Sequence, residues 1–109
     1  TQEIFKLVES KELGLALSWN KNYGNGTILW EYKIVQPRHK NPLAFMQIGS
    51  FDNGDVMGVT ITHIDNGQRG DCVDCETLTN ISAELSRIRR MIIIRKNIRK
   101  KFSMQNRRS

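Results

Sequence analysis

The chain has 109 residues, a net charge of +6 at pH 7 and 39 % hydrophobic side chains. Its length suits a single domain with one modest core, and no run of about 18 apolar residues occurs, so the sequence predicts no transmembrane segment. Two cysteines are too few for a disulfide scaffold, and the fold must therefore rest on side-chain packing.

A short helix is predicted over residues 2–13. Ile4, Leu7 and Val8 fall on one stripe at helical spacing, while charged side chains occupy the other sides. Gly14 ends the pattern, because glycine is a poor helix former and a common stop. A helix this short is not stable alone, so we expect it to pack on another element.

Four strands are predicted in the middle of the chain. The clearest of them alternates apolar side chains such as Trp30 and Tyr32 with charged ones. The turn dipeptide Asn25-Gly26 precedes it, and Gly54 marks a second turn. Turns at nearly regular spacing are typical of an antiparallel meander, with strands over residues 15–19, 27–36, 43–51 and 56–64.

A longer helix is predicted over residues 76–94. The polar residues 65–76 before it are expected to form a loop, in which Asn66-Gly67 marks a turn. The helix suits a lid over one face of the sheet, or one arm of a dimer. Its apolar side chains recur at alternating spacings of three and four, at Leu78, Ile81, Leu85, Ile88 and Ile92.

Together these elements predict an α+β fold, in which a four-stranded antiparallel meander is covered by a long C-terminal amphipathic helix with a short N-terminal helix beside it. We expect residues 1–94 to form a single domain. Residues 95–109 are expected to form a basic C-terminal extension that is partly disordered when free. This layout resembles that of small single-stranded nucleic-acid-binding modules of the Whirly kind and of coat proteins of small RNA phages, a resemblance that implies a nucleic-acid partner.

The basic residues are concentrated at the C-terminal end. Residues 87–109 hold ten of the 17 basic side chains and no acidic one, whereas the preceding 86 residues hold seven basic and eleven acidic side chains. The body therefore has a net charge of about −4 and the C-terminal end about +10. The ten cations are Arg87, Arg89, Arg90, Arg95, Lys96, Arg99, Lys100, Lys101, Arg107 and Arg108.

This concentration of charge indicates a polyanionic partner, because uncompensated cations repel one another. Seven of the ten are arginines, whose planar guanidinium groups suit bidentate contacts with phosphate. We therefore predict a non-enzymatic nucleic-acid-binding protein, for RNA or single-stranded DNA, whose ten C-terminal cations contact phosphates largely independently of base sequence. A structural component of a ribonucleoprotein or virion, assembled as a homo-oligomer, fits this prediction.

A second interpretation of the same segment is an adaptor for proteins or for anionic membranes. A basic amphipathic helix suits an acidic protein groove or an anionic lipid surface. Such binding requires Ile94, Ile98 and Phe102 on one exposed face, whereas phosphate binding requires only the cations. The run over residues 95–101 also fits a nuclear-targeting signal.

Two smaller features extend the predicted nucleic-acid site. Trp19 and Tyr23 lie at a strand end and in a polar loop, where their rings are available to stack on bases. Trp30 and Tyr32, in contrast, share a strand face with apolar residues and are expected to pack in the core. A second phosphate-binding patch is predicted at Arg38, His39 and Lys40.

The sequence indicates no cofactor, metal site or catalytic group. Cys72 and Cys75 form a single C-x-x-C, whereas a structural zinc ion takes four ligands, and whether the two thiols are free, bridged or metal-bound stays open. No nucleophile elbow, phosphate-binding glycine loop or H-E-x-x-H motif occurs, so we predict no enzymatic activity. The first residues lack the apolar core of a signal peptide, and an intracellular setting (cytoplasm or nucleus) or a virion is expected rather than secretion.

Overall fold

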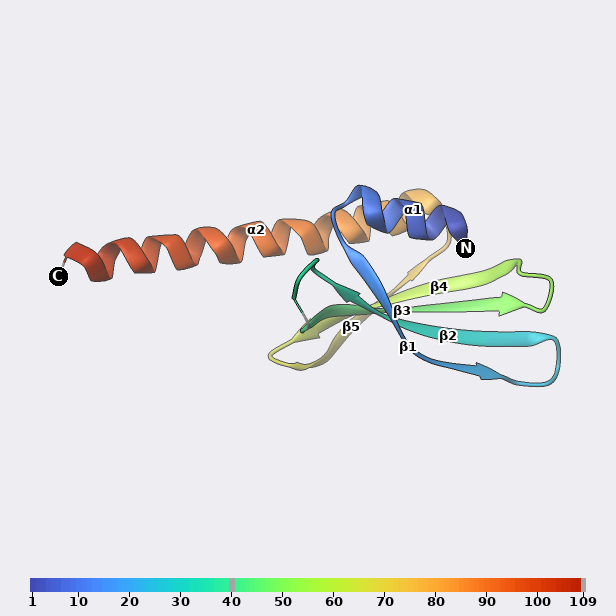
Figure 1. Ribbon diagram of the computed structural model, residues 1–109. Coiled ribbons are helices and arrows are strands. Elements are labelled where there is room, and N and C mark those ends of the chain that lie inside the picture. The colour runs from blue at the N-terminus through green and yellow to red at the C-terminus, as the bar shows by residue number, and fades with distance from the viewer. Residues whose placement is uncertain (40, 109) are drawn as a thin grey trace.

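The computed structural model describes residues 1–39 and 41–108, with side-chain surroundings up to residue 101. Along the chain, one helix precedes five consecutive strands and a second helix follows them (Figure 1). In order, the elements are α1 (Gln2–Ser10), β1 (Gly14–Asn22), β2 (Thr27–Val35), β3 (Pro42–Phe51), β4 (Val56–Asp65), β5 (Gln68–Cys75) and α2 (Leu78–Arg108).

The strands form one antiparallel meander in the order β1-β2-β3-β4-β5, so every strand pairs with its neighbour in the chain. The predicted α+β class, the antiparallel sheet, the short N-terminal helix and the long C-terminal helix are confirmed. The predicted number of four strands is wrong, because the segment expected to be a loop before α2 forms β5 at the edge of the sheet.

The dipeptide Asn66-Gly67 explains this fifth strand. Both residues have positive φ, 50° and 78°, and Asp65 pairs directly with Gln68, so the dipeptide is the two-residue turn of a β4–β5 hairpin. The strand itself is largely polar because it lies at an edge and its outer face meets water. Of its side chains, Cys75 is buried in the core and Val73 packs against it, too few for an alternation that stands out in the sequence.

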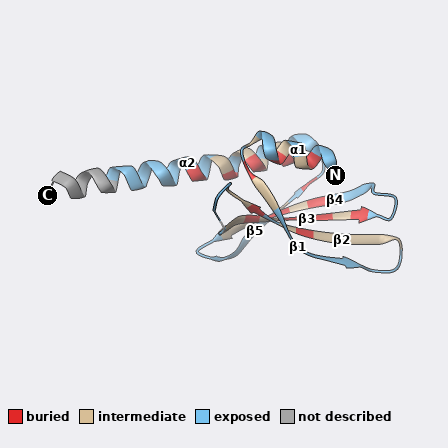
Figure 2. Ribbon diagram, viewed as in Figure 1, coloured by how far each residue is buried: buried red, intermediate tan, exposed pale blue. Residues whose placement is uncertain are grey.

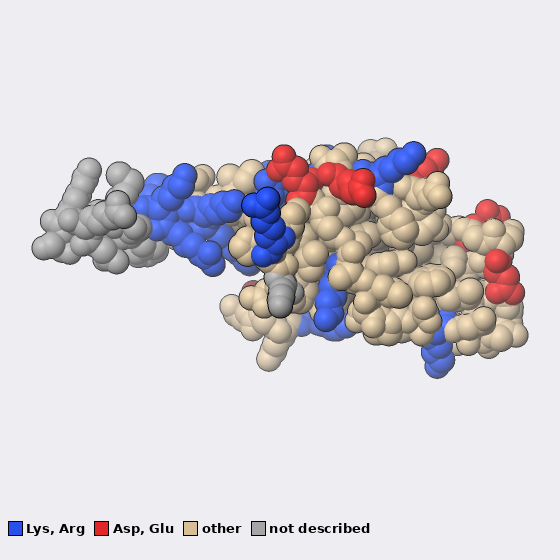
Figure 3. Space-filling model, in the orientation of Figure 1, with Lys and Arg blue, Asp and Glu red and all other residues tan. Residues whose placement is uncertain are grey.

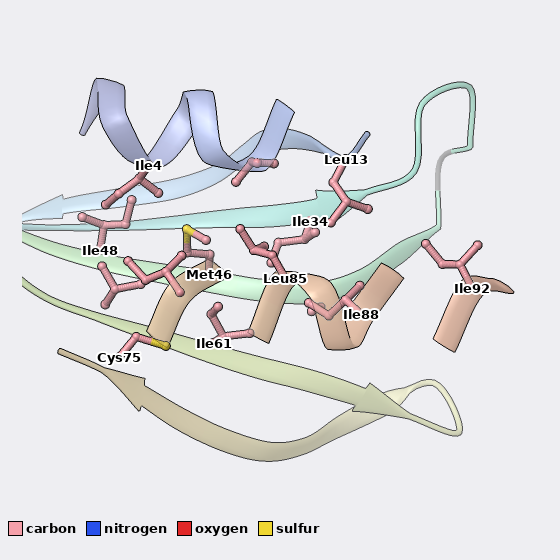
Figure 4. Packing of buried hydrophobic residues seen from close by; sticks show 14 residues of the cluster. Ile4, Leu13, Ile34, Met46, Ile48, Ile61, Cys75, Leu85, Ile88 and Ile92 are labelled. Atoms are coloured by element: carbon pink, nitrogen blue, oxygen red, sulfur yellow. The ribbon is translucent and has the colours of Figure 1, made fainter. Parts of the chain in front are cut away.

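Both helices pack on the same face of the sheet and enclose the core (Figure 2). The predicted stripe of α2 supplies four buried residues, of which Leu85 is fully buried against the strands. The close view in Figure 4 shows these side chains pointing from the helices and strands toward one another. The buried cluster comprises Ile4, Val8, Leu13, Ile34, Ala44, Met46, Ile48, Val59, Ile61, Cys75, Ile81, Leu85, Ile88 and Ile92.

Only the first half of α2 belongs to this packing. The helix has 31 residues, and its last buried side chain among those described is Ile92. Beyond that residue α2 continues away from the sheet, so the described part of the molecule measures 63 × 24 × 24 Å (Figure 1). The helix crosses residue 94 without a break, and the division of the chain into a domain and an extension at this position stays a prediction.

Candidate nucleic-acid interface

The part of α2 that follows Ile92, called its projecting part below, presents five of the ten predicted phosphate-binding side chains to solvent among the residues described, and Arg90 is exposed just before it. Figure 3 shows Lys and Arg gathered along it, whereas Asp and Glu lie over the body. Among the side chains that the structure describes, the exposed cations without an ion pair on this helix are Arg90, Arg95, Lys96, Arg99, Lys100 and Lys101. The side chains of Arg107 and Arg108 lie outside the described residues.

Two further predicted cations are held by acidic groups of the body. A guanidinium nitrogen of Arg89 lies 2.7 Å from a carboxylate oxygen of Glu12, which joins α2 to the residues just after α1. Arg87 lies 4.0 Å from Glu84, one turn earlier on α2. Arg89 therefore connects α2 to the segment between α1 and β1, and its contact with nucleic acid stays a prediction.

The cations of α2 do not all face the same way. With 3.6 residues per turn, Arg95 and Arg99 follow Ile88 and Ile92 along the side of the helix that is buried over the sheet. This side continues past the edge of the body, where charged residues replace the buried isoleucines. Arg95 and Arg99 are thus directed toward the loop between β2 and β3.

A groove lies where this side of α2 passes that loop. It has a volume of about 360 Å³, and its apolar floor includes Ile92 and Leu43. Four of its residues carry nitrogen donors suited to phosphate, because they are cations or a histidine, namely His39, Arg95, Lys96 and Arg99. Gln36 and Asn41 complete the polar lining.

The groove brings together two of the predicted basic groups, which are far apart in the sequence. His39 belongs to the predicted second patch, and its position beside α2 extends that patch into the basic helix. Arg38, next to it, is exposed and has a positive φ of 71°. Lys40 lies outside the described residues. Gln36 and Asn41 were not predicted from the sequence, since polar residues in a loop carry no distinguishing pattern.

The exposed aromatic residues lie elsewhere. Trp19 and Tyr23 are both exposed, and the ammonium group of Lys21 lies 4.9 Å from the centre of the Tyr23 ring. The β1–β2 hairpin that carries Tyr23 is at the end of the sheet remote from the projecting part of α2 (Figure 1). Stacking of bases on Trp19 and Tyr23 stays a prediction, whereas Trp30 and Tyr32 pack against the core as expected.

The sheet face that the helices leave uncovered carries a charged cluster that sequence analysis missed. The guanidinium of Arg69 donates two hydrogen bonds to the carboxylate of Glu31, at 2.9 and 3.1 Å, and lies 4.0 Å from the centre of the Phe45 ring. Gln47 donates a further hydrogen bond of 3.1 Å to Glu31. These contacts leave Glu31 only 1 % exposed on the outer face.

The surroundings of Glu31 stabilise its charged form. Burial of the carboxyl group opposes ionisation, but the hydrogen bonds from Arg69 and Gln47 outweigh it and hold the pKa of Glu31 below its ordinary value. The pKa of Arg69 is raised, chiefly by its hydrogen bonds to Glu31. Because Arg69 lies in β5, the partner of Glu31 was not evident without the fifth strand.

The two cysteines point to opposite faces of the sheet. Cys75 is buried in the core, where burial and then the nearby Glu84 and Asp74 carboxylates raise the pKa of its thiol. Cys72 is exposed and lies 3.3 Å from the hydroxyl of Thr62 on the other face. Within residues 1–39 and 41–101, no group of three or more metal-ligating side chains comes together.

In the part of the chain that the structure describes, no helix is both long and apolar enough to cross a membrane. Comparison with protein-family models, curated proteins and solved structures finds no match to this chain.

Proposed function

We propose that this chain is a non-enzymatic nucleic-acid-binding protein that neutralises the phosphates of RNA or single-stranded DNA with the projecting part of α2. The observation that carries the proposal is the groove between α2 and the β2–β3 loop, where three cations of α2 (Arg95, Lys96 and Arg99) and His39 of the loop line one surface. A role as a structural component of a ribonucleoprotein or virion would use the folded body for assembly and α2 for the nucleic acid.

The electrostatics favour a phosphate backbone as the ligand. Glu84 is the last acidic residue of the helix, and the exposed cations follow it without a compensating charge. A polyanion would therefore relieve their mutual repulsion. A helix with cations on several sides has no arrangement for reading base edges, and the binding is therefore expected to depend little on base sequence. Release of counterions makes such binding strongly dependent on salt.

The test compares two double variants that remove the same charge from different places. Lys96→Gln with Lys100→Gln removes two cations from the projecting part of α2, and Lys6→Gln with Lys33→Gln removes two exposed cations from the body. Binding to labelled single- and double-stranded RNA and DNA is measured by fluorescence anisotropy across a salt series. Affinity is plotted as log K against log [salt].

The α2 variant is expected to bind more weakly. The slope of its plot of log K against log [salt] is expected to be less steep by about 1.4–1.8, which corresponds to the loss of two phosphate contacts. The body variant has the same net charge and is expected to keep the wild-type slope. Equal slopes and affinities for the two variants would show that the binding follows net charge alone, and the proposed interface would be wrong.

One observation favours the adaptor or anionic-membrane interpretation as a second candidate. Ile94 and Ile98, two of the three residues that it requires, are exposed on α2, while the side chain of Phe102 lies outside the described residues. Co-sedimentation with vesicles of phosphatidylserine at low salt tests the lipid form. The membrane interpretation requires that the wild type binds the vesicles more strongly than Ile98→Asp does. If the wild type does not bind the vesicles, this interpretation is wrong.

A further inference from the structure

A second groove lies at the end of the body opposite to the projecting part of α2. It has a volume of about 450 Å³ and is formed where the starts of α1, β4 and α2 meet the end of β5. Its exposed apolar side chains include Met57 and Leu78. The charged residues in its lining are all acidic: Glu3, Asp74 and Glu76.

The projecting part of α2 carries the complementary surface. Met91, Ile94 and Ile98 recur at spacings of three and four, so they form one apolar stripe along the helix, and each is about half exposed. Helical geometry places Arg90 on one flank of this stripe and Arg95 on the other. The stripe is therefore apolar with cations at its sides, and the groove is apolar with acidic residues in its lining.

The stripe cannot reach the groove of its own chain. Leu78 lines the groove and begins α2, and the same unbroken helix carries Ile98 about 30 Å away at 1.5 Å per residue. Like charges also disfavour a parallel pairing of two projecting helices, because each carries only cations there. The acidic groove of a second molecule offers a surface of opposite charge that the stripe can reach.

We propose that the projecting part of α2 of one copy docks, through Ile94 and Ile98, into the acidic groove of a second copy of this chain. An amphipathic helix in a groove is a common mode of protein recognition. The contact joins two different surfaces, so it builds chains or rings, or a closed pair where two copies exchange helices. It goes beyond nucleic-acid binding and does not rest on it, because the stripe itself is apolar. Of the α2 cations that line the nucleic-acid groove, Arg95 flanks the stripe, whereas Lys96 and Arg99 lie away from it.

The first test measures self-association of the full chain by sedimentation equilibrium. Ile98→Asp places a carboxylate in the stripe, and Ile93→Asp is its matched control, because Ile93 is 48 % exposed, Ile98 is 47 % exposed, and Ile93 lies on another side of the helix. On the groove, Met57→Asp is compared with Leu17→Asp, whose parent side chains are 54 % and 53 % exposed. Circular dichroism confirms that each variant is folded.

The wild type is expected to associate reversibly. Ile98→Asp and Met57→Asp are expected to raise the dissociation constant at least about tenfold, because each would bury a carboxylate beside other acids or in an apolar contact. The two control variants are expected to associate like the wild type. Ile98→Asp and Ile93→Asp change the charge equally, so equal nucleic-acid affinity of the two separates this proposal from the proposed function.

The second test identifies the two surfaces by disulfide formation in a Cys72→Ser background. Ile98→Cys mixed with Met57→Cys is expected to form mixed dimers on mild oxidation, and Ile93→Cys with Met57→Cys is the control. Dimers of Ile98→Cys with itself in preference to the mixed pair would indicate helix-to-helix pairing and overturn the proposal. A wild type that stays monomeric at all concentrations would also overturn it, including one that binds anionic vesicles through Ile98.

Discussion

The carboxylate of Glu31 and the guanidinium of Arg69 form a two-pronged ion pair on the sheet face that the helices do not cover, with contacts of 2.9 and 3.1 Å. Glu31 lies in β2 and Arg69 in β5, so the pair joins two strands that are not neighbours in the sheet. The Arg69 side chain crosses the Phe45 ring of β3 to reach its partner. The pair thus holds the edge strand against the centre of the sheet.

We expect this pair to make the stability of the fold dependent on acid pH. The pKa of Glu31 is lower in the folded chain than in the unfolded chain, so its stabilisation is complete above the unfolded pKa and is lost as the pH falls through the folded pKa. Urea unfolding from pH 7 to pH 3 should show this loss in the wild type. Glu31→Gln should have a free energy of unfolding at pH 7 that is lower by about 1–2 kcal/mol. The value is modest because Arg69 is half exposed.

The matched control is Glu9→Gln, which removes an exposed carboxylate for which no ion pair is present among the described side chains. It should keep the wild-type stability at pH 7 and the wild-type dependence on pH. If Glu31→Gln were as stable as Glu9→Gln from pH 3 to pH 7, the ion pair would have no net effect on folding.

The β4–β5 turn should be sensitive to the loss of its glycine. Gly67 has a φ of +78°, which a residue with a side chain adopts only with strain. Gly67→Ala should therefore lower the free energy of unfolding by about 1 kcal/mol. Gly58→Ala is the control, because a Cβ there meets open space and the φ of Gly58 is not in the left-handed region. Thermal unfolding should place Gly67→Ala below the wild type and Gly58→Ala at or above it; the reverse order would contradict the assignment of the turn.

The packing of α2 on the sheet can be separated from its projecting half by two truncations of side chains. Leu85 is fully buried between α2 and the sheet, and Leu85→Ala should destabilise the fold by about 2–5 kcal/mol through lost burial and a residual cavity. Ile93→Ala removes an exposed side chain on the same helix and should stay within about 0.5 kcal/mol of the wild type. Chemical denaturation measures both, and equal losses would show that α2 is not docked as described.

Removal of residues 95–109 should separate folding from nucleic-acid binding. The core of the described residues ends at Ile92, so the truncated chain should keep its cooperative unfolding. It would lose seven of the ten C-terminal cations, and retention on heparin and on single-stranded oligonucleotides should be abolished. A truncated chain that is folded and still binds oligonucleotides with wild-type affinity would contradict the proposed function.

The long-range contacts show where prediction from the sequence failed. The stripe of α2 and the alternation of β2 were evident, because each is a local period that burial of one face imposes. The strand β5 was missed since an edge strand with a polar outer face needs only Val73 and Cys75 on its inner face. Without β5, neither the partner of Glu31 nor the acidic lining at Asp74 was evident.

The candidate interface was predicted in part. The cations of α2 and His39 were identified from charge alone, but their meeting in one groove depends on the direction in which α2 leaves the sheet. That direction follows from the packing of Leu85 and Ile88 on the strands. Helical spacing then places Arg95 and Arg99 beside the β2–β3 loop.

The sequence by itself determined the separation of a weakly acidic body from a strongly basic C-terminal end, because charge is a property of composition and position along the chain. It also determined the helical stripe that packs on the sheet. The tertiary structure alone decided which cations of α2 face the β2–β3 loop and which form ion pairs with the body. It also decided where the acidic groove lies. These features arise when packing and strand pairing join residues distant in sequence, and local patterns carry no information about such contacts.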